Sequence, residues 1–153
     1  MIFSAVRKGK DVFPYANDIN PGDDITFDET VTNIGSGMDP ESGVFTAPVS
    51  GIYSFSFSAL LYFKKDRMRD WGIVEVLKGG QVEFNIKEHH GDFKTGEFEG
   101  INYSWMMSLA QNEEVNLRMY ERSVSQIMVY NNPTNPSLRN FVWFNGQLLD
   151  ASE

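Results

Sequence analysis

The run from Tyr53 to Ser58 alternates an aromatic ring with a serine at every step. In an extended strand, successive side chains point to opposite faces, so the rings of Tyr53, Phe55 and Phe57 share one face and the serines share the other. Helical spacing does not produce this order. The run therefore predicts a β-strand with one buried face and one polar face, and a chain built on such strands must pack its sheets around a core.

Two later segments repeat this alternation. Residues 101–109 alternate large apolar side chains with mostly polar ones, and residues 115–119 do the same. The short polar stretch at 110–113 predicts a hairpin turn, so we expect these two segments to be neighbouring antiparallel strands. Further strands are expected between turn-forming residues, at 25–32, 44–46, 71–78, 82–87 and 138–149.

The chain lacks features that would divide it or add helices. No segment has the apolar period of an amphipathic helix, and we find neither an internal repeat nor a linker. We therefore expect one all-β domain over residues 1–153, with its strands paired into two packed sheets or a barrel.

Composition narrows the class of partner. The 153 residues carry a formal net charge of −8, which repels phosphate backbones and anionic membranes, so no nucleic-acid partner is expected. The absence of cysteine excludes disulfides, thiolate metal sites and a cysteine nucleophile. No apolar run reaches the length of a membrane helix, so we expect no membrane insertion. The opening residues lack signal-peptide features, which leaves the compartment open.

The sequence contains no catalytic motif. A phosphate-binding glycine loop with its lysine, a nucleophile elbow and a zinc helix with paired histidines are all missing. The only histidines, His89 and His90, are adjacent, and neighbouring side chains of an extended segment point to opposite faces. We interpret them as solvated loop residues rather than metal ligands, and we expect no enzymatic activity.

One segment has part of the spacing of a calcium loop. Asp18, Asn20 and Glu29 occupy its first, third and last positions, but the glycine falls at Gly22 and not at the sixth position where the turn is made. A turn-rich connection between strands explains the segment more simply. We assign no cofactor and leave calcium as the alternative.

Four stretches of the sequence resemble the globular head of the complement C1q family. They are Phe3-Ser-Ala5, Ile25-Thr-Phe-Asp28 continuing to Thr32-Asn33, Gly43-Val-Phe-Thr-Ala-Pro-Val-Ser-Gly-Ile-Tyr-Ser-Phe55, and the closing Phe144-Asn-Gly-Gln-Leu-Leu149. The resemblance covers nearly the whole chain. It implies a ten-strand jelly roll shared with the tumour-necrosis-factor superfamily, secretion and a compact homotrimer.

The resemblance also separates structural residues from binding residues. Together with the alternation, it assigns structural roles to Phe27, Gly43, Phe45, Gly51, Tyr53, Phe55, Trp105, Phe144, Gly146 and Leu148. The sequence has no collagen-like repeat and no core cysteine, in which it resembles the secreted head-only lectins of invertebrates. The glycosylation sequon at Asn102-Tyr103-Ser104 is compatible with secretion.

Two functions follow as hypotheses. The first is a pattern-recognition lectin of innate immunity, a trimer that binds microbial glycans through three equivalent sites. The alternative is an adhesion or signalling module that binds a protein receptor. Protein interfaces favour dry apolar patches, whereas sugars need polar groups and an aromatic face. The loops of this chain are polar, which favours the lectin.

A jelly roll brings alternate connections to one end, so we expect the connections at 64–70, 88–100 and 121–137 to converge. The first is basic, the second acidic and the third rich in asparagine. Their candidate ligand-binding residues are Lys64, Lys65, Arg67, Arg69, Trp71, Tyr130, Asn131 and Asn132. The alternative is that opposite charges merely pair there at a solvated surface.

Overall fold

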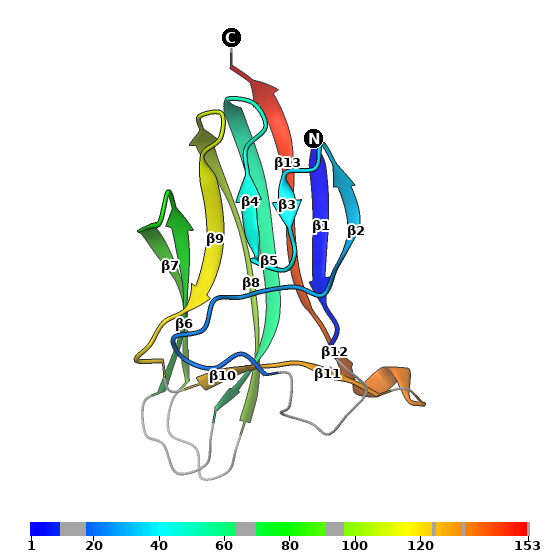
Figure 1. Cartoon of the computed structure of the whole chain (residues 1–153). Coiled ribbons are helices and arrows are strands. Elements are labelled where there is room, and N and C mark those ends of the chain that lie inside the picture. The colour runs from blue at the N-terminus through cyan, green and yellow to red at the C-terminus, as the bar shows by residue number, and fades with distance from the viewer. Residues whose placement is uncertain (10–17, 64–69, 91–96, 124, 133, 153) are drawn as a thin grey trace.

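The computed structural model describes residues 1–9, 18–63, 70–90, 97–123, 125–132 and 134–152. Within these ranges the chain forms thirteen β-strands and one turn of 3-10 helix, and ten of the strands are three residues or longer (Figure 1). No helix of the described chain is long and apolar enough to cross a bilayer. The expected all-β class is confirmed, with two packed sheets rather than a closed barrel.

The first sheet is built around the long strand that carries the serine and aromatic alternation. This strand, β5 (Gly51–Phe63), pairs along its whole length with β8 (Glu97–Leu109) on one side. On its other side, the two halves of β5 pair with β13 (Val142–Ala151) and β10 (Ser125–Met128). Beyond β13, the sheet continues through β1 (Ile2–Arg7) and β2 (Glu29–Ile34). All of these pairs are antiparallel.

The second sheet covers the aromatic face of the first. Its order is β3 (Met38–Asp39), β4 (Val44–Thr46), β9 (Glu114–Met119), β6 (Asp70–Lys78) and β7 (Gln81–His90). Gly79 and Gly80 join β6 to β7 with positive φ angles of 58° and 79°, as a tight hairpin requires. A small pair, β11 (Tyr130–Asn131) with β12 (Arg139–Asn140), lies at one end with the 3-10 turn η1 (Pro136–Leu138).

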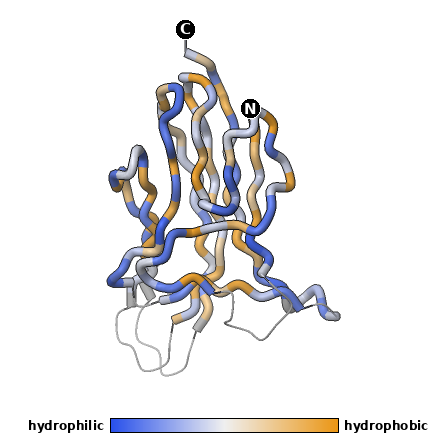
Figure 2. Tube along the Cα trace, in the orientation of Figure 1, coloured by the Kyte–Doolittle hydropathy of each residue, from blue (hydrophilic) through white to orange (hydrophobic). Residues whose placement is uncertain are grey.

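The core between the sheets is aromatic. Figure 2 shows hydrophobic and hydrophilic positions alternating along the long strands. The Phe55 ring stacks on Trp105 and on Phe144, with centroids 5.6 and 5.8 Å apart. Phe3 packs edge-on against Phe144 at 5.1 Å. The other predicted structural side chains, Phe27, Phe45 and Tyr53, are buried as well, and Leu148 is partly buried against them.

Gly146 allows these rings to approach the backbone. A Cβ at this position would lie 2.4 Å from Cε1 of Phe3 and 2.9 Å from Cδ1 of Phe55, so a larger residue would displace both rings. Gly43 has a φ of 75°, and its Cβ would lie 2.1 Å from the carbonyl oxygen of Ile25. Gly51 is similarly close to the carbonyl oxygen of Asp150.

The predicted pairing of residues 101–109 with 115–119 is wrong. These segments form β8 and β9, which lie in different sheets: β8 pairs with β5, and β9 pairs with β4 and β6. The turn between them is present, since Glu113 N donates to the carbonyl of Ala110 at 3.0 Å, but it crosses from one sheet to the other. Alternation shows which face of a strand is buried and does not show which strand lies beside it.

Other strand boundaries also differ from the expectation. The expected strand at 25–32 begins only at Glu29, and Ile25 instead donates its N–H to the carbonyl of Leu117. The final run is divided into β12 and β13. His89 and His90 end β7, paired with Trp71 and Asp70, so their assignment to a loop is wrong. Backbone pairing continues there because it does not depend on whether the side chains are polar.

Candidate binding surfaces

The ends of several strands meet at the end of the sandwich that the sequence singles out (Figure 1). Phe63 of β5 pairs with Glu97 of β8 and with Ser125 of β10, and Asp70 of β6 pairs with His90 of β7. The connections at 64–70 and 88–100 therefore leave and re-enter the sheets at this one end, which we call the loop end. The expected connection at 121–137 is not a single loop, because it contains β10 of the first sheet and β11, and Ser125 of β10 brings its first part to the same end. The predicted cationic residues Lys64, Lys65, Arg67 and Arg69 lie outside the described residues, and their role in binding stays a prediction.

The other candidate binding residues lie on two separate strands at the loop end. Trp71 is the first residue of β6 whose side chain the structure describes, and 45% of its surface is exposed. Its carbonyl accepts a hydrogen bond from Ser123 Oγ at 3.1 Å. Tyr130 and Asn131 form β11 beside Asn132.

The amide of Asn132 is already occupied within its own loop. Its Oδ1 accepts the backbone N–H groups of Thr134 and Asn135, at 2.9 and 3.0 Å, and its Nδ2 donates to the hydroxyl of Tyr130 at 3.2 Å. This amide shapes the loop and holds Tyr130 in position.

The three residues with calcium-loop spacing have separate partners. Asp18 is buried, and its Oδ1 accepts the N–H of Val129 at 3.0 Å. Burial raises the pKa of Asp18, because desolvation disfavours the charged carboxylate. Asn20 Oδ1 accepts from Gln126 Nε2, and Glu29 pairs with Lys8 Nζ at 2.6 Å. In the part of the chain that the structure describes, no three acidic or histidine side chains gather as a metal site.

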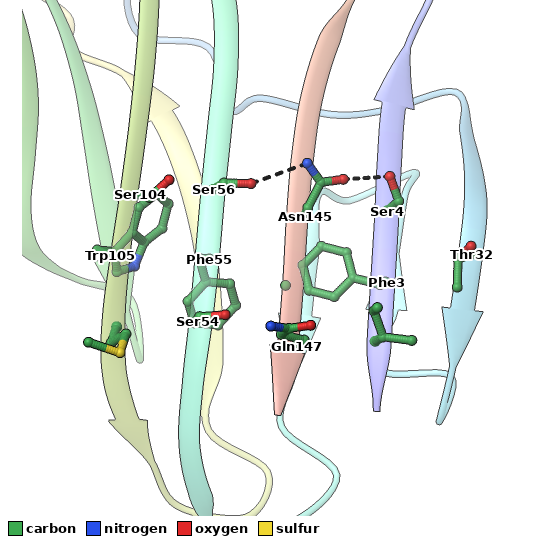
Figure 3. A pocket seen from close by; sticks show the side chains of 13 residues that line it. Phe3, Ser4, Thr32, Ser54, Phe55, Ser56, Ser104, Trp105, Asn145 and Gln147 are labelled. Carbon is green, nitrogen blue, oxygen red and sulfur yellow. Dashed lines mark hydrogen bonds between the residues drawn. The ribbon is translucent and has the colours of Figure 1, made fainter. Parts of the chain in front are cut away.

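A row of polar side chains crosses the outer face of the first sheet, which the serine alternation predicts only as a polar face. The register aligns one residue from each of five strands, and these five define the polar row: Thr32, Ser4, Asn145, Ser56 and Ser104. Ser4 Oγ donates to Asn145 Oδ1, and Asn145 Nδ2 donates to Ser56 Oγ at 3.2 Å (Figure 3). The serines that alternate with the rings in β5 and β8 are the signal for this row.

The polar row lies in a hollow of about 570 Å³. The next aligned row along the strands has apolar side chains at its ends and Gln147 and Ser54 in its centre. Of these apolar side chains, Ile2 is 42% exposed and Met106 is 69% exposed, and both line the hollow. The hollow thus joins a hydrogen-bonding floor to an apolar rim.

The sandwich is open on the side of β7 and β8. Among the described residues, β8 pairs only with β5 and β7 only with β6, so each strand has one unpaired edge. Between them, the ring of Phe84 contacts Tyr103 and Trp105 at centroid distances of 5.8 and 5.5 Å. Tyr103 is 45% exposed, and Trp105 Nε1 is buried without a hydrogen-bond partner. We call β7, β8 and these three rings the open edge.

Solved structures of other proteins share this architecture. The globular domain of zebrafish complement 1qA protein aligns with a TM-score of 0.64 and 16% identity over 99% of this chain and 98% of that one. The crystal structure of murine APRIL aligns with a TM-score of 0.58 and 13% identity over 95% and 98%. Identities this low establish the fold alone, and they confirm the jelly roll.

Sequence comparison identifies the family. Human and mouse complement C1q tumor necrosis factor-related protein 3 are each 30% identical over 100 residues, which is 65% of this chain. The chain spans only 38% of the length of these relatives. The model of the C1q domain matches residues 2–149. This chain therefore belongs to the C1q domain family.

Proposed function

We propose that this chain is a secreted, non-enzymatic pattern-recognition lectin that assembles as a homotrimer and binds microbial surface glycans. The observation that carries the proposal is the presence of two complementary surfaces on one chain, the hollow with its polar row and the open edge. Together they can join one chain to the next and so provide the several equivalent sites that multivalent glycan binding needs.

The open edge of one chain fits the hollow of the next. The apolar rim at Ile2 and Met106 would cover the exposed ring of Tyr103, which removes apolar area from water. The polar row offers hydroxyl and amide groups to the unpaired backbone groups of β8, which need partners once water is excluded. Because the two surfaces differ, the contact is heterologous, and such contacts form a ring when the rotation closes. The family resemblance supports a ring of three.

Trimer formation gives the loop end its function. In a cyclic trimer whose axis runs along the strands, the three loop ends lie on the same side of the ring, so three weak sites can engage one surface together. Tyr130 and Trp71 supply aromatic faces for sugar rings, and Asn131 supplies an amide for hydroxyl groups. An extracellular location is part of the proposal, because microbial glycans are met outside the cell.

A protein-receptor module is the second candidate function. The observation that favours it lies on the edge strand β2, where Val31 is 59% exposed and Ile34 is 65% exposed. Exposed apolar side chains grouped on one strand are typical of protein interfaces.

A glycan array, screened with and without a chelator, separates the two functions. The lectin proposal predicts saturable binding to microbial glycans, with loss of binding when Trp71, Tyr130 and Asn131 are replaced together by alanine. Loss of signal with the chelator would add calcium as a cofactor. A folded trimer that binds no glycan would contradict the lectin and favour the receptor module. Undiminished binding by the folded triple variant would exclude the loop end as the site.

A further inference from the structure

A second hollow, of about 290 Å³, lies on the outer face of the second sheet. It is lined by Gly22, Glu75, Arg118, Tyr120 and Glu121. Glu75 of β6 and Arg118 of β9 are direct neighbours in the register, and Arg118 Nε donates to Glu75 Oε1 at 3.0 Å. Only 9% of the Glu75 side chain is exposed, so a nearly buried carboxylate forms part of the wall.

This ion pair leaves hydrogen-bonding groups unused. Within the described part of the chain, the second carboxylate oxygen of Glu75, Oε2, accepts no hydrogen bond, and neither Nη group of Arg118 donates one. Oε2 is not sealed from solvent, unlike the unpartnered oxygen of Asp18. The hydrogen bond to Glu75 raises the pKa of Arg118, so the guanidinium stays charged. One strong acceptor and several charged donors thus remain available side by side.

The charges around the hollow disfavour an anion, because Glu75 and Glu121, with Asp24 close enough to act on Arg118, outnumber the one guanidinium. A cation at Glu75 Oε2 would meet the guanidinium that already pairs with the same carboxylate. A pair of neighbouring hydroxyl groups meets neither repulsion, because one hydroxyl can donate to Glu75 Oε2 while the other accepts from an Arg118 Nη group. This pairing is the chemistry of a vicinal diol on a neutral sugar ring.

Tyr120 and Gly22 complete the fit to such a ring. Tyr120 is half-buried, and its ring can cover the apolar face of a sugar. Gly22 adopts a φ of 91°, and its N–H donates to the carbonyl of Met119 at 2.8 Å, which holds the turn against β9. No side chain projects from Gly22 into the hollow. The volume is near the lower end of the range for small-molecule sites, about 300–1,000 Å³, which suits a single ring.

We propose that this hollow, the Glu75–Arg118 site, binds the vicinal diol of a neutral sugar ring. Glu75 Oε2 accepts from one hydroxyl, Arg118 donates to its neighbour and Tyr120 covers the ring. The proposal rests on the glycan-binding role given above and adds to it a site that the sequence does not single out. The site lies beside the start of the 121–137 connection and shares none of the loop-end candidates.

Saturation-transfer NMR tests the site on the intact protein, with methyl α-D-mannopyranoside and methyl β-D-galactopyranoside at millimolar concentration as probes. We expect transfer to the ring protons of at least one probe. Glu75→Gln keeps the acceptor for Arg118 Nε but replaces Oε2 with an amide donor, so affinity should fall about tenfold or more. Glu114→Gln is the matched control, since it makes the same change at an exposed position four residues from Arg118 on β9, and it should bind like the parent.

Arg118→Lys provides a second variant should Glu75→Gln fail to fold. It keeps the positive charge and removes the planar fork of donors, so it should also weaken binding about tenfold. No transfer to either probe would overturn the proposal, and so would unchanged affinity in a folded Glu75→Gln or Arg118→Lys protein. Array binding that survives Glu75→Gln but not the loop-end triple variant would overturn this site and leave the lectin function standing. Loss in Glu75→Gln alone would support this site and exclude the loop end.

Discussion

The two faces of the first sheet come from the same strands but differ in the chemistry and the burial of their side chains. On the inner face, Phe55, Trp105 and Phe144 stack and are 9% exposed or less. On the outer face, the neighbouring residues Ser56, Ser104 and Asn145 align in the polar row. The inner face is explained by burial within one chain. The outer face is open to solvent in the single chain, and our proposal uses its order for assembly.

The inner face should be far more sensitive to truncation than the outer face. Phe55→Ala removes a buried ring and leaves a cavity among Phe3, Trp105 and Phe144, so we expect a loss of about 3–5 kcal/mol in the free energy of unfolding. Ser56→Ala, one residue along, should change it by about 1 kcal/mol or less. Urea unfolding followed by circular dichroism measures both. Similar losses for the two variants would remove the distinction between the faces.

A larger side chain should also cost more stability beside the buried rings than at an open position. In Gly146→Ala the new methyl group would meet the rings of Phe3 and Phe55, so we expect a loss of about 1–3 kcal/mol. Gly100→Ala on β8 is the control, because its Cβ would have no neighbour closer than 3.9 Å. The midpoints of thermal unfolding should differ accordingly. Equal midpoints would mean that the rings beside Gly146 move aside at no cost.

A smaller effect concerns a buried carboxylate outside both faces. Burial raises the pKa of Asp18 above its usual 3.8, so the folded protein holds this proton at pH values where the unfolded chain has lost it. The resulting stabilisation is complete below the unfolded pKa and is lost as pH rises through the raised folded pKa. Asp18→Asn has no carboxyl group to titrate and so does not lose stability in this way. Its free energy of unfolding relative to the parent should therefore increase as pH rises from the unfolded pKa of Asp18 through the raised folded pKa. Parallel pH profiles would contradict the assignment.

The buried face could be predicted from the sequence because alternation is a local property. The rings of Tyr53, Phe55 and Phe57 are buried, as period two requires. Strand partners are not local. The turn at 110–113 is compatible both with a hairpin in one sheet and with a crossing between sheets, and only the packing of the whole chain selects the crossing.

The candidate surfaces show the same limit. The polar row depends on the register of five strands from distant parts of the chain. The Glu75–Arg118 site joins two residues that are 43 positions apart in the sequence. Neither arrangement leaves a motif in the sequence. The convergence at the loop end could be expected, because it follows from the topology that the resemblance implies. The roles of Trp71, Tyr130, Asn131 and Asn132 in binding stay predictions.

Sedimentation equilibrium at micromolar concentration tests the central claim, that the polar row and the open edge join one chain to the next. The parent protein should have three times its chain mass of 17.4 kDa. Ser56→Arg places a long charged side chain in the hollow and should give a folded monomer, whereas Ser152→Arg, near the end of the chain, should remain a trimer. A parent at 17.4 kDa, unchanged on concentration, would contradict the account, and so would a trimeric Ser56→Arg protein.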